Sequence, residues 1–234
     1  MKTTALKSRG SNTMKFAILT FPGTSCEVDM HHALSTVVGG ESEIVWHKDA
    51  DISNYDGIII PTGATFGDYL RPGALAKSTT LANQVVAFAK TGKPVIGVGS
   101  GFHVLVELGL LPGAFLMNPS LKFETGKVNV KVNTNTKFTS HYDENVVIAL
   151  PYAHQFGSYY IDEKTAQQLQ DNNQVVFTYT DESFNSIANI AGVVNEAGNV
   201  LGVMPLPERA VEEIIGGIDG LPFFESTLKN WSEQ

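Results

Sequence analysis

The sequence predicts an α/β fold in which a mostly parallel sheet is flanked by helices and extended by an antiparallel section. Three observations lead to this prediction. Apolar runs of strand length alternate with helical patterns through the first half of the chain, as they do in parallel sheets. Residues 93–98 end in a glycine-rich turn that leads directly into a helical pattern. Residues 122–132 alternate polar with apolar side chains, which is typical of an antiparallel strand with one solvated face.

The first half of the chain supplies the predicted parallel strands. An apolar run at 15–21 indicates a buried first strand, and Pro22-Gly23-Thr24-Ser25 is a turn that opens a helix running to about residue 38. Further strands are expected at 43–46, 57–60 and 93–98, with helices at 74–91 and from 100 to about 111. Ligands of such sheets bind beyond the carboxyl ends of the strands, so the loops after residues 60 and 98 are expected to meet there.

The second half supplies the antiparallel section and the end of the fold. Strands are expected at 122–132, 146–149, 158–161 and 175–179, with a helix at 164–170. A hairpin turned by residues 195–199 joins strands at 187–194 and 200–204, and two helices follow, ending at Trp231. We predict one domain over residues 14–234, preceded at 1–13 by a disordered extension or tag remnant.

Composition limits the classes of function. A net charge of −8 and a pI near 5.2, without clustered Lys or Arg, argue against nucleic acid or an anionic membrane as a partner. The apolar runs are far shorter than the ~20 residues that span a bilayer. The single cysteine, Cys26, precludes an internal disulfide and favours a cytoplasmic location. The six histidines lack metal-ligand spacing, so we predict no metal and no cofactor.

The turn after residue 98 has the pattern of a nucleophile elbow. In α/β enzymes a Ser or Cys stands at the apex of this strand–turn–helix, in a strained conformation that flanking glycines permit. The apex residue here is Gly99, which adopts a positive φ at little cost. We therefore expect the geometry of the elbow without its nucleophile.

Three segments resemble one enzyme family in order and spacing. Residues 97–103, 61–71 and 205–210 are similar to the glutaminase subunit of phosphoribosylformylglycinamidine synthase, a triad-type class I glutamine amidotransferase of purine biosynthesis. The resemblance covers residues 14–231. It implies a flavodoxin-like class I glutamine amidotransferase fold, including the antiparallel section between the elbow and the last of these segments.

The resemblance also implies where a catalytic triad would stand. The nucleophile maps to Gly99, the base to Leu206 and the carboxylate to Glu208, so only the last group is retained. Glycine has no nucleophile and leucine no proton acceptor, which closes the covalent route. We predict a pseudoenzyme. Glu208 also has a structural explanation, because Pro207 can open a helix whose positive end favours a carboxylate.

The family's remaining site positions are partly changed. Thr62 stands where relatives have the first of two glycines in the loop that binds the oxyanion, and His103 stands where they have glutamine. A misaimed Thr62 backbone would remove one oxyanion donor. Residues 151–157 replace an Ala-His-Gly-Glu-Gly type segment near the synthase interface, and keep its histidine. The implied oxyanion loop is Thr62, Gly63 and Ser100, the glutamine pocket His103, Gly67, Asp68 and Tyr69, and the candidate interface residues His154 and Arg71.

The resemblance implies a binding role and leaves two alternatives. As a scaffold, cap or regulator, the chain would bind the large subunit and the small bridging subunit of the synthase. In the first alternative it is an enzyme with other chemistry, through Glu208, His154, Ser100 or Cys26. Ser100, His103 and Glu107 would share one helical face, and Cys26 is either a packing thiol or one activated by a helix N-terminus. In the second alternative it binds glutamine or a nucleotide without turnover.

Overall fold

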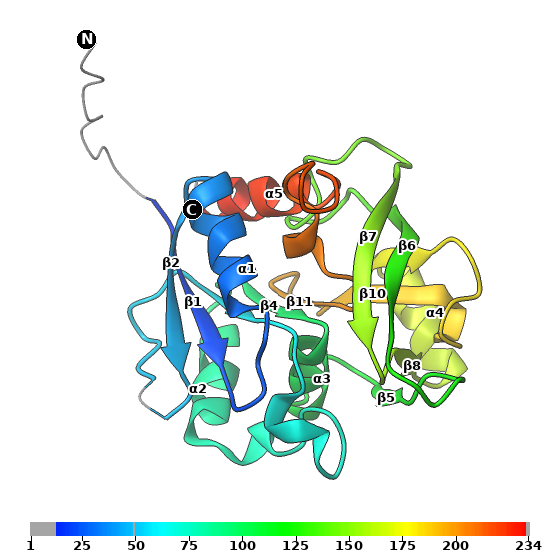
Figure 1. The fold of residues 1–234 in the computed structure, drawn as a ribbon, viewed down its shortest axis with the longest axis horizontal. Coiled ribbons are helices and arrows are strands. Elements are labelled where there is room, and N and C mark those ends of the chain that lie inside the picture. Colours follow the sequence, from blue (N-terminus) through cyan, green and yellow to red (C-terminus); the bar gives the residue numbers. More distant parts are fainter. Residues whose placement is uncertain (1–12, 49, 233–234) are drawn as a thin grey trace.

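The computed structural model describes residues 13–48 and 50–232, which are built around a nine-stranded sheet of order β2-β1-β3-β4-β11-β10-β9-β6-β7 (Figure 1). The predicted segment 1–13 lies outside the described residues except for Thr13. The strands on one side of the sheet are parallel, which confirms the predicted α/β class. They are β2 (Glu41–Trp46), β1 (Lys15–Thr20), β3 (Gly57–Ile60), β4 (Val95–Val98) and β11 (Val200–Val203).

The other side of the sheet is antiparallel. From β11 the pairing continues antiparallel through β10 (Ile190–Val194), β9 (Val175–Tyr179), β6 (Glu124–Val132) and β7 (Val147–His154). A separate two-stranded sheet joins β5 (Ala114–Leu116) to β8 (Ser158–Tyr160). The predicted antiparallel section is therefore present.

Helices cover both faces of the sheet (Figure 1). One face carries α1 (Glu27–His31), the π-helical η1 (His32–Val37) and α5 (Leu221–Ser232). The other carries α2 (Thr80–Ala89), α3 (Ser100–Glu107) and α4 (Glu163–Asp171). Shorter 3₁₀ turns are η2 (Thr65–Asp68), η3 (Ala76–Ser78), η4 (Ile187–Asn189) and η5 (Pro207–Arg209).

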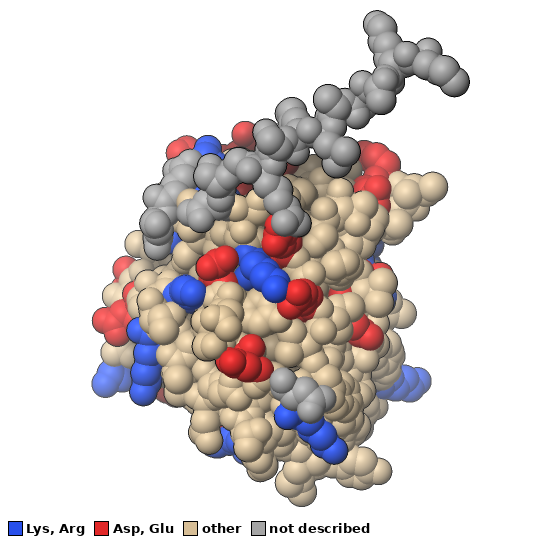
Figure 2. Space-filling model, turned by 90° about the vertical axis from the view of Figure 1, so that its left-hand side faces the viewer, with Lys and Arg blue, Asp and Glu red and all other residues tan. Residues whose placement is uncertain are grey.

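Successive strand residues divide the core into two apolar layers. On β1, Phe16 and Ile18 pack on the α1 and α5 side, and Ala17 and Leu19 pack on the α2 and α3 side. This alternation follows from the two-residue period of a strand, and a parallel strand buried on both faces is apolar throughout. Figure 2 views the side of the molecule that carries the edge strand β2, where acidic and basic side chains are interspersed. In the part of the chain that the structure describes, no helix has both the length and the apolar character to cross a bilayer.

Several predicted boundaries were wrong. The strand predicted at 146–149 continues as β7 to His154, because it pairs residue by residue with β6. The strand predicted from 187 begins at Ile190 after a 3₁₀ turn. After Pro207 there is one 3₁₀ turn and one α-helix in place of two helices. Gly216, Gly217 and Gly220 lie between them, and glycine is unfavourable inside helices.

Candidate active site

The turn between β4 and α3 has the geometry of an elbow. Gly99 takes φ 53° and ψ −113°, which is the positive φ predicted from its position. Gly101, two residues later, lies against β3, and a Cβ atom added there would collide with the backbone carbonyl of Ile60. The tight turn thus depends on glycine at both positions, for conformation at one and for close approach at the other.

Thr62 and Leu206 surround the place where a side chain on residue 99 would stand. A Cβ atom added to Gly99 would lie 2.7 Å from Thr62 Cβ, in collision with its hydroxyl, and 3.5 Å from Leu206 Cδ2. Positions 99 and 206, far apart in the sequence, are therefore adjacent. The Thr62 side chain fills the space that a nucleophile would need.

The Thr62 hydroxyl also accepts a hydrogen bond from the backbone N–H of the residue after the apex. Ser100 N–H donates to Thr62 Oγ1 at 3.3 Å. In hydrolases with this elbow, the N–H after the nucleophile is one of the donors to the oxyanion. Thr62 has no positive φ, whereas Gly63 beside it has a φ of 155°. The Thr62 side chain thus reaches both the apex and the donor that follows it.

Glu208 is buried without a partner. Its side chain is 1% exposed, and neither carboxyl oxygen has a hydrogen-bond partner. Burial raises its pKa to about 8, with a smaller lowering by the nearby Arg209 guanidinium. Pro207 does open the 3₁₀ turn, as the structural explanation supposed, but the carboxyl group lies inside the protein. Leu206, at the position that the resemblance assigns to the base, has no polar side-chain group.

Cys26 is a packing thiol. It is 2% exposed, and burial together with the Glu208 carboxyl raises its pKa to about 12. Arg209 Nη2 donates to its sulfur at 3.1 Å and Arg209 Nε to Asp29 Oδ2 at 3.2 Å. The thiolate is not formed near neutral pH, so activation by a helix N-terminus is not observed.

The three polar residues predicted to share a face of α3 have separate partners. Ser100 Oγ lies 3.2 Å from Thr65 Oγ1, and His103 Nε2 lies 2.8 Å from the Phe156 carbonyl oxygen. Glu107 pairs with Arg71, whose Nη2 donates to Oε2 at 2.7 Å. No relay from serine to histidine to carboxylate is assembled, because each side chain is held elsewhere.

Of the candidate interface and pocket residues, some are buried in the protein interior and others are exposed on its surface. His154 is 6% exposed at the end of β7, so it forms part of the interior wall. Arg71 is exposed and held by Glu107. Gly67 and Asp68 have positive φ within η2, and Tyr69 after them is 74% exposed.

A cavity of about 500 Å³ lies at the carboxyl ends of β3 and β4. It brings together eight of the sequence-predicted residues, which are Cys26, Thr62, Gly63, Asp68, Ser100, His103, His154 and Leu206. The other predicted residues do not line it, namely Gly67, Tyr69, Arg71, Gly99, Glu107 and Glu208. Sequence reasoning missed Phe156 as the acceptor for His103, and Asn118, a fully buried amide that contacts His154. No sequence pattern marks either contact.

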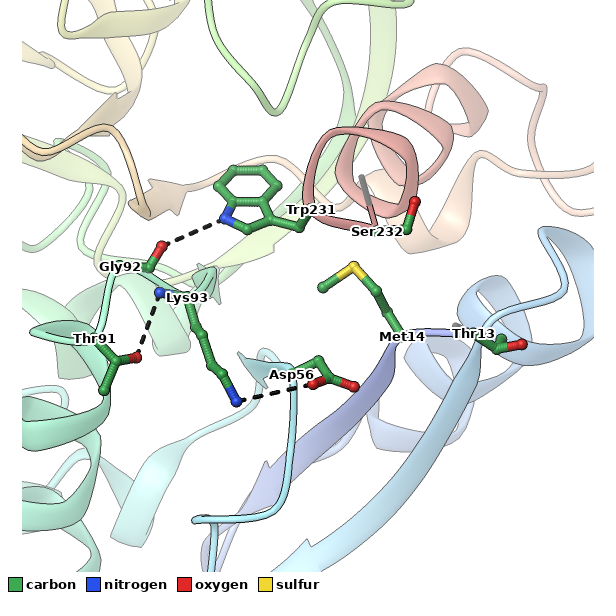
Figure 3. A pocket seen from close by; sticks show the side chains of 8 residues that line it. All are labelled: Thr13, Met14, Asp56, Thr91, Gly92, Lys93, Trp231 and Ser232. Atoms are coloured by element: carbon green, nitrogen blue, oxygen red, sulfur yellow. Dashed lines mark hydrogen bonds and ion pairs between the residues drawn. The ribbon is translucent and has the colours of Figure 1, made fainter. Parts of the chain in front are cut away.

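A second cavity, of about 250 Å³, lies at the amino ends of the parallel strands (Figure 3). Two contacts join residues that line it: Lys93 Nζ lies 3.8 Å from Asp56 Oδ1, and Trp231 Nε1 donates to the Gly92 carbonyl at 3.4 Å. Across residues 13–48 and 50–232, no group of three or more His, Cys, Asp or Glu side chains could hold a metal ion. The cavity at the carboxyl ends of β3 and β4, which gathers the sequence-predicted residues, is therefore the candidate site.

Comparison with known proteins identifies the lineage of this site. Residues 13–218 match the model of the CobB/CobQ-like glutamine amidotransferase domain. The chain belongs to this glutamine amidotransferase family. A chain in the structure of PurLQS from Thermotoga maritima is 41% identical, with a TM-score of 0.85, over 93% of this chain and 98% of that one. The relation to the glutaminase subunit of phosphoribosylformylglycinamidine synthase is thereby confirmed.

A more distant amidotransferase shares the fold. A glutamine amidotransferase from Thermotoga maritima is 14% identical, with a TM-score of 0.61, over 95% of this chain and 99% of that one. At this identity the match concerns the fold alone.

Proposed function

We propose that this chain is a pseudoenzyme of the synthase glutaminase lineage, which acts in purine biosynthesis by binding other subunits and does not hydrolyse glutamine. The observation that carries the proposal is the elbow, where Gly99 has no side chain and Thr62 occupies the space above it. We also propose that it acts in the cytoplasm, where the lone buried Cys26 stays reduced.

The missing groups are those that the covalent route requires. Hydrolysis of the glutamine amide needs a thiolate to attack, a histidine to transfer protons and a carboxylate to hold that histidine. In another hydrolase, removal of the central triad members lowers turnover by a factor on the order of 10⁶. The repurposed-enzyme alternative has little support, because the Cys26 pKa is raised and the α3 residues form no relay.

Exposed apolar side chains near the cavity support a partner surface. Tyr69 is 74% exposed and Leu70 86%, on the loop after β3, and Leu121 is 68% exposed and Phe123 63%, on the segment before β6. We call these four residues the rim surface. Leu70 and Leu121 both have positive φ, which is a strained backbone conformation for a bulky residue. Strain of this kind clusters at functional sites.

We propose that the rim surface contacts the synthase large subunit, with the small bridging subunit in the same assembly. The solved relative comes from an assembly titled PurLQS. Phe123 lines the cavity, and so does Asp68, which directly precedes Tyr69 in the chain. The rim surface therefore borders the cavity from two separate segments. A partner bound there would also cover the cavity.

We expect the purified chain to co-sediment with the two synthase subunits and to release no ammonia from glutamine above background. Replacing an exposed leucine with a carboxylate places a charge in the interface, so Leu70→Asp should weaken the complex at least roughly tenfold. The matched control is Ile44→Asp on the edge strand β2, where the side chain is 46% exposed. Analytical ultracentrifugation measures both variants.

Two results would contradict the proposal. Absence of a complex, with or without nucleotide and glutamine, removes the partner. Stoichiometric labelling by a serine- or cysteine-directed probe, with turnover of glutamine, removes the pseudoenzyme assignment.

A further inference from the structure

The two outer edges of the nine-stranded sheet differ. At one edge, β7 is covered by the chain that follows β11: Leu206 N–H donates to the Pro151 carbonyl at 2.8 Å, and Ala149 N–H donates to Asp219 Oδ2 at 2.8 Å. At the other edge, β2 pairs with β1 and, among the described residues, with no further strand. Figure 2 views the side of the molecule that carries this open edge. The sheet therefore has one covered edge and one open edge.

Every second residue of β2 directs its backbone hydrogen-bonding groups away from the sheet. Glu41 N–H donates to the Met14 carbonyl at 3.2 Å and His47 N–H to the Thr20 carbonyl at 3.0 Å, so the odd-numbered residues of β2 bond to β1. In a parallel pair the residues between them direct their N–H and C=O groups to the opposite side. These residues are Ser42, Ile44 and Trp46.

The open edge lacks the usual protection against pairing. Proteins guard edge strands with lysine, proline, β-bulges or short length. β2 runs for 6 residues in continuous register with β1 and contains neither lysine nor proline. The Glu43 carboxylate is held within its own chain, because it lies 2.8 Å from Lys15 Nζ and accepts a hydrogen bond from Tyr55 Oη. An unguarded strand of this length is a template for a further strand.

Apolar side chains border the open edge on its α1 face. Ile44 is 46% exposed and Trp46 is 43% exposed. Both point to the same face of the sheet as Ser42, whose hydroxyl lies 2.8 Å from His31 Nδ1 on α1. Val28 lies one helical turn before His31 and is 64% exposed. A strand added to β2 would therefore find apolar contacts as well as backbone partners.

We propose that β2 pairs with β2 of a second copy of this chain, antiparallel about a two-fold axis at Ile44. In this register Ile44 lies opposite its own copy and Ser42 lies opposite Trp46, so the outward N–H and C=O groups meet partners. Glu43 lies opposite Val45, which keeps these carboxylates from facing one another across the pair. A two-fold dimer buries the same patch on both copies, so the strand has to complement itself, and β2 does.

The dimer should be weak and independent of the proposed function. One pair of strands of this length buries less surface than stable dimers do, so we expect a dissociation constant of roughly 10–100 μM. The proposal goes beyond the scaffold role, because it needs neither synthase subunit. The open edge shares no residue with the rim surface. Ile44→Asp should therefore break the dimer without weakening the contact with the synthase.

Sedimentation equilibrium of the full-length chain over about 1–300 μM tests the dimer. Ile44→Asp and Ile44→Lys each place like charges at the two-fold axis, so each should raise the dissociation constant at least roughly tenfold. An equimolar mixture of the two variants places opposite charges there and should restore association. The matched control is Val147→Asp on the covered edge strand β7, where the side chain is 53% exposed, and it should leave the dimer unchanged.

Amide hydrogen exchange of the unaltered protein gives a readout that needs no variant to fold. The amides of Glu43 and Val45 bond to β1, so they should be protected at every protein concentration. The amides of Ser42, Ile44 and Trp46 face the open edge, so their protection should rise with protein concentration.

Several results would overturn the proposal. A monomer across the whole concentration range removes the second copy, and a dimer unchanged in both Ile44 variants lies at another surface. Failure of the mixed variants to associate contradicts the axis at Ile44. Protection of the Ile44 amide that appears on adding the synthase subunits, and not on concentrating the chain, would assign the edge to another protein. Leu70→Asp should leave the dimer intact, so the synthase proposal and this one fail separately.

Discussion

A Thr62→Gly, Gly99→Cys, Leu206→His triple variant should release ammonia from glutamine, whereas the Gly99→Cys, Leu206→His double variant should not. The double variant restores the thiol and the imidazole, but the added side chain on residue 99 would collide with the Thr62 hydroxyl. Removing that side chain also frees Ser100 N–H, which now donates to Thr62 Oγ1 at 3.3 Å. One oxyanion donor is worth roughly 10²–10³ in turnover.

We therefore expect the triple variant to exceed the double variant by at least about 100-fold in a coupled ammonia assay. Thr62→Gly alone is the matched control, since it opens the space without adding a nucleophile. Equal turnover in the double and triple variants would show that Thr62 obstructs neither the thiol nor the oxyanion donor.

Protein stability should show the same steric conflict without any chemistry. Gly99→Ala should lower the free energy of unfolding more in the Thr62 protein than in the Thr62→Gly background, because only the former contains the collision. In both backgrounds a non-glycine residue at this positive φ costs about 1–3 kcal/mol. A urea-denaturation cycle over the four proteins gives the difference. Identical losses in the two backgrounds would place the Thr62 side chain away from the apex.

The elbow could be predicted because its determinants are local. An apolar strand, a glycine at the apex and an immediate helical pattern lie within one short segment, and each has its own conformational cause. The role of Thr62 could not be predicted in the same way. Its contact with Gly99 crosses from the loop after β3 to the turn after β4, and it depends on side-chain volume.

Predictions failed where pairing or burial overrides local pattern. β7 extends to His154, beyond the strand predicted to end at residue 149, because its register with β6 supplies hydrogen-bond partners along its length. The three polar residues of α3 have the right spacing for a relay, yet Thr65, Phe156 and Arg71 bind them from other segments. Helical spacing predicts which side chains share a face, but it does not predict their partners.

Glu208→Gln should remove a pH dependence from the stability of the protein. The folded-state pKa of Glu208 is raised by burial from its ordinary value of 4.5 to about 8. Between these values the unfolded chain loses the proton while the folded protein retains it, so rising pH favours unfolding. The contribution of this group is fully present below about pH 4.5 and is lost as pH approaches 8.

The size of the effect follows from linkage. One proton bound in the folded state and released in the unfolded state changes the free energy of unfolding by roughly 1.4 kcal/mol per pH unit. Across the window this amounts to a few kcal/mol, so wild-type stability should fall relative to Glu208→Gln between pH 5 and pH 8. Urea unfolding at unit pH intervals measures the difference between the two proteins, which cancels the contributions of other groups such as His103 and His154.

The matched control is Glu196→Gln, a substitution of an exposed carboxylate in the turn between β10 and β11. Its pH profile should run parallel to that of the wild type. Leu206→His tests the same cause by adding a charge, because the resemblance implies that an imidazole at this position would be held by the Glu208 carboxylate. An imidazole there would favour the charged form of Glu208, lower its pKa and flatten the profile. A wild-type profile parallel to that of Glu208→Gln would mean that this carboxyl group ionises normally in the folded protein.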